Sequence, residues 1–237
     1  MLQINNLTKS YKGGKTAVKD LSLDIMPGDI YGFIGHNGAG KTTTIKCVTG
    51  ILPFEQGEIY VDGHSVKEDP VYCKSVIAYI PDNPDIYGFM TGIKHINFIA
   101  DIFGVSKQDR ERRIATYADK FGITADLGSR IDSYSHGMKQ KLVLISALVH
   151  KPKLMVLDEP FVGLDPTAAY NLKQILTEHC MEGGAVFFST HVLEVAEKLC
   201  NKIAIIKQGE LKVSGKTEDV CKNESLEQFF LELNAYE

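Results

Sequence analysis

The chain contains a glycine-rich segment whose residue types and spacing can bind phosphate. It fits the pattern GxxxxGK(S/T) and consists of Gly35, His36, Asn37, Gly38, Ala39, Gly40, Lys41 and Thr42. Glycines let successive backbone N–H groups converge on phosphate oxygens, and a helix expected over Thr42–Thr49 adds its partial positive charge. Lys41 can reach the β- and γ-phosphates, Thr42 can ligate Mg²⁺, and Thr43 is placed to contact the α-phosphate. The segment predicts a nucleoside triphosphate site; the alternative is a glycine-rich turn with a chance lysine.

Two adjacent carboxylates follow an apolar run, Leu154–Leu157. Ligands of parallel sheets gather at the carboxyl ends of the strands, so Asp158 is expected beside the phosphate loop, where it would hold Mg²⁺ directly or through water. A second carboxylate is not needed for metal binding alone. Glu159 suits a general base that polarises the attacking water. The alternative is a strand followed by a solvated Asp-Glu-Pro turn.

The composition is that of an ordinary globular protein. The chain has 237 residues, 24% of them charged and 44% hydrophobic, with a net charge of −4. Length predicts one to two domains, and the charge argues against broad nucleic-acid binding through a basic surface. We expect neither a membrane-spanning segment nor a signal peptide. Five cysteines without a CxxC pair favour reduced thiols over a zinc site.

Apolar periodicity indicates the elements that must position these residues. Strands are expected over Val18–Ile25, Ile30–Ile34, Glu58–Val61, Ser75–Ile80, Lys153–Leu157, Ala185–Ser189, Lys202–Ile206 and Glu210–Val213. Helices are expected over Ile93–Ile102, Asp109–Phe121, Met138–Leu148, Thr167–His179 and Val192–Cys200. Strands that alternate with helices imply right-handed crossovers and a mostly parallel sheet. The stretch without strand signal, roughly 83–150, predicts a helical insert in an α/β fold, and the tail at 215–237 is amphipathic and helical.

Further segments carry a family resemblance. Tyr134-Ser135-His136-Gly137-Met138-Lys139-Gln140-Lys141 resembles the LSGGQ signature of ATP-binding-cassette (ABC) ATPases, and Gly163-Leu164-Asp165-Pro166 resembles their D-loop. Ser189-Thr190-His191 resembles the switch histidine after its strand, and Tyr11 is similar to the aromatic that stacks on adenine. The chain thus resembles the nucleotide-binding subunit of an ABC transporter over nearly its whole length.

The resemblance implies a fold and a chemistry. The fold would be the P-loop ABC ATPase fold, with a mostly parallel core sheet, an N-terminal antiparallel β part and a helical insert in one nucleotide-binding domain, 1–237. The cofactors would be ATP and Mg²⁺. Ser135, His136 and Gly137 would close over the γ-phosphate held by a second, facing subunit, with Asp165 nearby. His191 would reach the γ-phosphate and the attacking water, beside Glu159 and Lys41.

Simpler readings exist for some of these residues taken one at a time. Ser135 could be an ordinary helix cap. His191 could be a polar helix start, and Tyr11 an exposed strand aromatic.

Two positions depart from the family pattern. Asp82 stands where the family usually has a glutamine; a carboxylate can still ligate Mg²⁺ there, and it adds negative charge near the γ-phosphate. We therefore expect Asp82 to be a metal ligand and to make turnover more dependent on Mg²⁺. His136 replaces a signature glycine, and its side chain is expected to point outward so that the anion site survives.

The expected partners follow from the same resemblance. They are transmembrane permease subunits and a second nucleotide-binding subunit, identical or not, with no direct nucleic acid. The chain would lie on the cytoplasmic face of the cell membrane and serve a transporter of the small two-component exporter type. Ile86–Met90 is either part of a groove for a partner's short helix or a loop packed on its own insert.

Other classes fit the chain less well. The main alternative is a soluble ABC-class ATPase acting on ribosome or nucleic-acid complexes. A GTPase should carry an Asn-Lys-x-Asp guanine reader, which is missing from the sequence. A non-catalytic regulatory cassette is disfavoured because Glu159 and His191 are both present.

Overall fold

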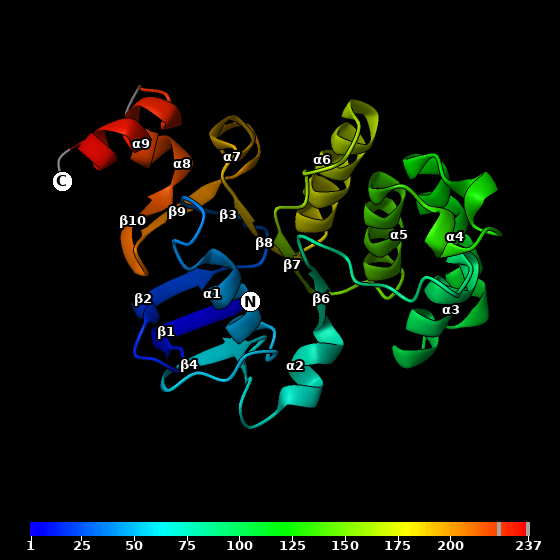
Figure 1. Ribbon diagram of the computed structural model, residues 1–237, viewed down its shortest axis with the longest axis horizontal. Coiled ribbons are helices and arrows are strands. Elements are labelled where there is room, and N and C mark those ends of the chain that lie inside the picture. The colour runs from blue at the N-terminus through cyan, green and yellow to red at the C-terminus, as the bar shows by residue number, and fades with distance from the viewer. Residues whose placement is uncertain (222–223, 236–237) are drawn as a thin grey trace.

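The computed structural model describes residues 1–221 and 224–235 and contains two sheets (Figure 1). The first is antiparallel, in the order β2-β1-β4-β5. Its strands are β1 Leu2–Ser10, β2 Thr16–Ile25, β4 Gln56–Val61 and β5 His64–Ser65. Leu2, Ile4 and Leu7 of β1 are buried while residues between them are exposed, which is the pattern of a sheet with one covered face. The N-terminal antiparallel part is thus as expected, although the sequence pattern did not single out β1.

The second sheet has the order β10-β9-β3-β8-β7-β6. Its strands are β3 Ile30–Ile34, β6 Ile77–Ile80, β7 Leu154–Asp158, β8 Ala185–Thr190, β9 Lys202–Lys207 and β10 Glu210–Lys216. All neighbouring strands are parallel except β10, which pairs antiparallel with β9 at the edge. Every residue of β3, β7 and β8 is buried, because both faces of this sheet are covered.

Alternate residues of the central strands enter two cores. Tyr31 and Phe33 of β3 pack with the antiparallel sheet and helix α1, Lys41–Val48. Ile30 and Ile34 pack on the opposite face with α5, α6 and α7. These helices span His136–Leu148, Pro166–Met181 and Leu193–Leu199. The parallel sheet is therefore the middle layer of the molecule, and its strand ends are held rigidly from both sides.

A helical region lies between β6 and β7 in the chain. It contains α3 Gly92–Ile102, α4 Lys107–Phe121, two short 3₁₀ turns at Thr124–Asp126 and Ile131–Ser133, and α5. Thr91, Ser106 and Ser135 cap α3, α4 and α5 by accepting a backbone N–H three residues on. In Figure 1, α3 and α4 lie at the opposite end of the molecule from α8 Thr217–Cys221 and α9 Leu226–Ala235.

One predicted strand begins too early. Ser75 and Val76 belong to helix α2, Pro70–Val76, and not to a strand. Asp69 caps this helix, and Pro70 stands at its first turn, where its missing N–H costs nothing. The strand β6 therefore begins only at Ile77. Other bounds differ by a few residues, as for α4, which begins at Lys107 because Ser106 is its cap.

The amphipathic tail forms α9, in which Leu226 and Phe230 are buried. The part of the prediction that falls on 222–223 and 236–237 lies outside the described residues. Within residues 1–221 and 224–235, no helix is both long enough and apolar enough to cross a membrane.

Candidate nucleotide site

The glycine-rich loop connects the end of β3 to the start of α1. Gly40 precedes α1 with φ of 113°, in the region that favours glycine. A Cβ atom on Gly40 would also lie 2.5 Å from the carbonyl oxygen of Ala17. The loop is thus held against the antiparallel sheet at a distance that no larger residue permits. This geometry leaves the backbone N–H groups at the start of α1 free for an anion.

Lys41 is buried with its ammonium group among oxygen atoms. Its Nζ donates to the carbonyl of Gly35 at 2.6 Å and to that of His36 at 3.4 Å. It lies 3.6 Å from Oε1 of Glu159. The ammonium group is therefore positioned inside the loop by backbone acceptors, and phosphate oxygens can replace these weak partners with charged ones.

Three oxygen-bearing side chains meet at the ends of β7 and β8. The Thr42 hydroxyl donates to Oδ2 of Asp158 at 2.7 Å, and the Ser189 hydroxyl donates to Oδ1 of the same carboxylate. Asp158 and Ser189 are neighbours because β7 and β8 pair directly at these two residues. Hydroxyl and carboxylate oxygens are the ligands that Mg²⁺ prefers, and the ion keeps several sites for water and phosphate. Thr42 and Asp158 therefore fit a Mg²⁺ site completed by a nucleotide.

Glu159 and His191 directly follow the same two strands, β7 and β8, and their side chains lie close together. Nδ1 of His191 lies 2.9 Å from Oε1 of Glu159, and the backbone N–H of His191 donates to Oε2 at 3.4 Å. Oε1 is buried and makes no aligned hydrogen bond among the described residues, although His191 and Lys41 lie near it. Glu159 also has φ of 50°, an uncommon backbone conformation for a side chain of this size. A constrained carboxylate with a free acceptor atom is suited to take a proton.

Most of these residues line one cavity of about 510 Å³, whereas Ser189 and His191 are not among its lining residues. Its walls include Tyr11, His36, Asn37, Gly38, Gly40, Lys41, Thr42, Thr43, Asp82, Asp158 and Glu159. The Tyr11 hydroxyl lies 3.1 Å from the Thr43 hydroxyl, and its ring is about half exposed, so a flat base can reach it. Asp82 reaches the cavity from the segment after β6. Gly35 and Ala39 belong to the loop backbone but are not among the lining residues.

The structure does not bring Ser135, His136, Gly137 and Asp165 into this cavity. Ser135 caps α5, and Asp165 caps α6 by accepting the N–H of Ala168 at 2.9 Å. Lys141 lies 2.6 Å from Asp165, and its hydrogen bond, followed by that of the Ala168 N–H, lowers the pKa of the Asp165 carboxyl.

The signature segment and the D-loop instead touch each other. The exposed His136 side chain lies across Gly163, where a Cβ atom would come within 2.7 Å of Cδ2 of the imidazole. Gly163 has φ of 80°, a backbone conformation that favours glycine, whereas the exposed His136 ring could move away from a Cβ atom. The expected outward orientation of His136 is thus right as to exposure, but the ring packs on the D-loop.

The comparisons with known proteins show the family of the chain. The family model described as "ABC transporter" matches residues 18–162. The chain belongs to the ABC transporter family. The ATP-binding protein LnrL of linearmycin resistance in Bacillus subtilis strain 168 is 34% identical over 221 residues, 93% of this chain and 71% of LnrL. The ABC-type transporter ATP-binding protein EcsA of the same organism is 34% identical over 98% of this chain and 96% of its own.

Solved structures have the same fold. The ATP-binding subunit of an ABC transporter has a TM-score of 0.95 and 31% sequence identity, covering 99% of both chains. A dimeric ATP-binding cassette bound to ADP and Pi in a post-hydrolysis state has a TM-score of 0.83 at 21% identity, covering 92% of this chain and 99% of its own. This chain is therefore an ATP-binding subunit of the ABC transporter family, with the ABC ATPase fold.

Sequence reasoning missed part of the ABC cassette's site. Ser189 was identified only as part of the switch segment, yet its hydroxyl orients the Asp158 carboxylate. Lys15, Thr16, Ala17 and Gln208 complete the cavity wall. Gln208 was visible only as half of a Gln-Gly turn. These residues lie on loops and strand ends whose proximity to the phosphate loop depends on the pairing of distant segments.

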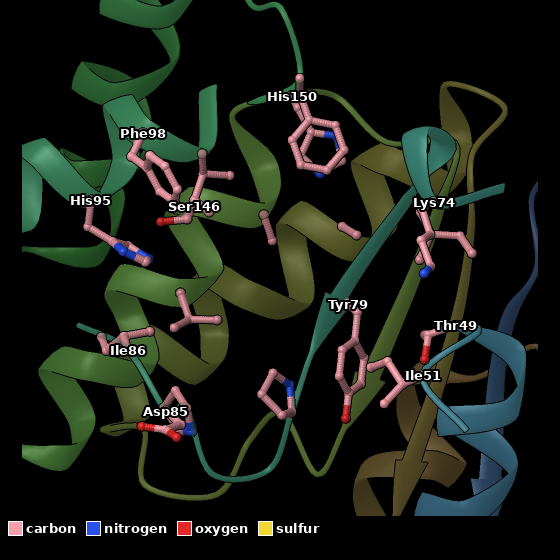
Figure 2. Close-up of a pocket in the computed structure, with 18 of the residues that line it drawn as sticks. Thr49, Ile51, Lys74, Tyr79, Asp85, Ile86, His95, Phe98, Ser146 and His150 are labelled. Atoms are coloured by element: carbon pink, nitrogen blue, oxygen red, sulfur yellow. The ribbon is translucent and has the colours of Figure 1, made fainter. Parts of the chain in front are cut away.

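The cassette has a second cavity, of about 530 Å³, between the helical region, strand β6 and the end of α1. Figure 2 shows Thr49, Ile51 and Tyr79 on one side, and His95, Phe98 and Ser146 on the other. Burial, then the charges of Asp158 and Asp82, raises the pKa of Tyr79 to about 12. Of the stretch Ile86–Met90, Ile86 and Tyr87 line this cavity. Ile86 and Met90 also pack against the core of the helical region, so the groove and the loop packed on its own insert both stay open for this stretch.

Proposed function

We propose that this chain binds and hydrolyses ATP with Mg²⁺ and uses the cycle to drive separate membrane-spanning subunits. The observation that carries the proposal is the convergence of Lys41, the Thr42–Asp158 pair and Glu159 in one cavity, with His191 beside Glu159. These are the parts that phosphoryl transfer needs: a phosphate cradle, metal ligands and a base beside the water.

Each residue has a distinct task in the proposed mechanism. Lys41 and the N–H groups of the loop hold the phosphate oxygens, and Tyr11 supports the base of the nucleotide. Bound Mg²⁺ would neutralise phosphate charge, held by Thr42 and Asp158 with Asp82 close by. Glu159 accepts the proton of the attacking water through Oε1 or Oε2. His191, 2.9 Å from Glu159, orients that carboxylate and donates toward the γ-phosphate.

We further propose that residues 1–237 form one nucleotide-binding domain, with a helical subdomain at roughly 83–150 and a helical tail at 215–237. Ser135, His136, Gly137 and Asp165 lie outside the chain's own cavity, which supports a role toward the nucleotide of a second copy. The ABC cassette that has been solved as a dimer with ADP and Pi supports the same arrangement. The second copy would be identical or a related cassette.

The membrane partner would dock at the second cavity. The segment after β6 contributes to both cavities: Asp82 lines the first, and Pro84, Asp85, Ile86 and Tyr87 line the second. If bound nucleotide displaced Asp82, the following residues that line the second cavity would therefore move as well. Tyr87, Phe98 and Ile51 leave large apolar surfaces exposed around it, which suits an apolar helix of a permease subunit. In this arrangement the chain lies on the cytoplasmic face of the membrane, and the association of LnrL with linearmycin resistance favours export.

Affinity purification tests the proposal. Tagged Glu159→Gln chain is purified with ATP from gently solubilised native membranes, and co-purifying proteins are identified by mass spectrometry. Lys41→Ala is the matched control, because it removes the charge that pairs with phosphate and should not form the ATP-bound pair. A polytopic membrane protein at equal stoichiometry supports the transporter role. Recovery of ribosomes or nucleic acid instead would favour the soluble ABC-class alternative.

A further inference from the structure

The C-terminal helix α9 touches the phosphate loop at a residue that lines the nucleotide cavity. The Phe230 ring packs on the His36 imidazole, with ring centroids 4.9 Å apart and an interplanar angle of 59°. Phe230 is only 8% exposed although it lies near the end of the chain. His36 occupies a position that the pattern GxxxxGK(S/T) leaves unspecified, and it lines the nucleotide cavity. A residue outside every recognised motif is thus in contact with the nucleotide site.

The backbone of His36 takes part in the hydrogen bonds that hold the loop together. Its carbonyl accepts the N–H of Ala39 at 3.1 Å and Nζ of Lys41 at 3.4 Å. The loop is rich in glycine and has few side chains that can hold it from outside. Contact with the Phe230 ring therefore reduces the mobility of His36 and of the loop backbone next to it. The N–H groups of this backbone must converge on phosphate. Preorganisation of this kind raises affinity because less entropy is lost when the ligand binds.

The helix α9 is itself fixed to the element that follows the switch histidine. It packs on α7, and the N–H of Leu226 donates to Oε2 of Glu197 at 3.0 Å. Helix α7 begins at Leu193, two residues after His191. Figure 1 shows α9 beside α7 and α8 at the end of the molecule away from the helical region. Phe230 is therefore held by a packed helix on the core.

We propose that Phe230 is a positioning residue for the phosphate loop and that α9 sets the affinity of the chain for ATP. This rests on the proposed function only in that the loop binds nucleotide. Loss of the ring is expected to weaken ATP binding about two- to tenfold, the range given by the worth of an aromatic pair. The KM for ATP should rise while kcat is retained, because the contact acts on the loop and not on the reacting atoms.

Four full-length chains test the proposal: wild type, Phe230→Ala, Phe230→Tyr and Leu231→Ala. Leu231 is the matched control because it is a neighbour on the same helix and is 58% exposed. Affinity is measured by titration with a fluorescent ATP analogue, beside the thermal midpoint and ATPase kinetics. We expect weaker binding for Phe230→Ala alone, with Phe230→Tyr and Leu231→Ala like wild type. Should Phe230→Ala fail to fold, Phe230→Leu removes the ring with less loss of volume and carries the same expectation.

A double-mutant cycle with His36→Ala separates positioning from general stability. Phe230→Ala should change the affinity little in the His36→Ala background, because the contact is already absent. Fully additive effects, or an affinity of Phe230→Ala equal to that of Leu231→Ala, would overturn the inference. Failure of wild type to bind the analogue would instead contradict the proposed function, so the two outcomes are distinguishable.

Discussion

At the scale of single residues, Glu159 is the most constrained member of the site. Its backbone has φ of 50°, its N–H donates to both the carbonyl and the hydroxyl of Ser189, and its Oε1 is buried without an aligned hydrogen bond. Strained backbone persists only where the surroundings over-determine it, and such residues concentrate at functional sites. The carboxylate is thus aimed by its backbone conformation together with the hydrogen bond that Oε2 accepts from the His191 N–H.

Glu159→Gln is expected to lower ATP hydrolysis about 10²- to 10⁴-fold, the usual worth of a general base. ATP affinity should stay the same or rise, since the amide keeps the shape and removes a negative charge near Lys41. Phosphate release and analogue binding measure the two quantities. Hydrolysis at the wild-type rate would show that Glu159 is not the base.

Asp82 leads to a prediction about the metal. Its carboxylate adds negative charge to a cavity that receives phosphate, so more of the compensating positive charge must come from Mg²⁺ than with a neutral residue there. Turnover of Asp82→Gln should therefore fall less than that of wild type when Mg²⁺ is lowered. Asp82→Asn is the matched control, because it removes the charge while keeping the length. Identical Mg²⁺ titration curves for all three proteins would contradict this role.

At the scale of elements, Ser135 at the start of α5 has two possible roles, as a helix cap and as a contact to the nucleotide of a second copy. The Ser135 hydroxyl accepts the N–H of Met138 at 3.3 Å, as an ordinary cap does. Lys141, one turn further on, reaches Asp165 at the start of α6. His136 lies across Gly163 in the loop before α6. The two helix starts therefore form one surface, and it does not line the chain's own nucleotide cavity.

Two substitutions at Ser135 separate these readings. Ser135→Ala should lower the free energy of unfolding by about 1 kcal/mol, while Ser135→Asp keeps a good cap and costs little. If Ser135 faces the phosphate of a second copy, both variants lose hydrolysis, and the aspartate loses more because its charge repels phosphate. Denaturation curves and ATPase rates test this. Wild-type hydrolysis by Ser135→Asp would leave Ser135 as a cap only.

At the scale of the whole molecule, the second cavity joins the helical region to the rest of the fold. Its walls come from the end of α1, from β6, and from α3 and α5. His150 lines it and stacks on Phe103, with centroids 3.8 Å apart and the rings nearly parallel. Burial, then the charge of Arg113, lowers the pKa of His150 to about 4. Burial lowers the pKa of His95 in the same cavity as well.

These pKa shifts predict a loss of stability in acid. Because the folded pKa of His150 is below the ordinary 6.5, the neutral ring stabilises the fold fully above pH 6.5 and progressively less as the pH falls toward 4. His150→Phe keeps a ring on Phe103 and cannot titrate. Relative to wild type, its free energy of unfolding should gain up to about 3 kcal/mol between pH 7 and pH 4.

Denaturant unfolding at several pH values measures this difference. The other histidines are common to both proteins and cancel in the comparison. If the free energy of unfolding changed equally with pH in wild type and His150→Phe, the assignment of the pH dependence to His150 would be contradicted.

The sequence alone predicted those parts of the candidate site whose residues are contiguous in the chain. The phosphate loop, the Asp158–Glu159 pair, the signature and the switch histidine each combine side chains within a few positions of a strand or helix end. Alternating apolar runs also predicted the parallel sheet, because strand and helix periods are local properties. The predicted start of one strand was wrong. Ser75 and Val76 belong to helix α2, because the Asp69 cap and Pro70 favour a helix over the strand that the apolar pattern predicted.

What only the tertiary structure decided is which of these segments meet. Ser189 joins the Asp158 carboxylate because β7 and β8 are paired in register at these residues. Gln208 and Lys15 reach the nucleotide cavity, and Phe230 reaches His36, from opposite ends of the chain. Strand order and the packing of distant helices depend on the sum of many weak non-local contacts, which no local pattern encodes.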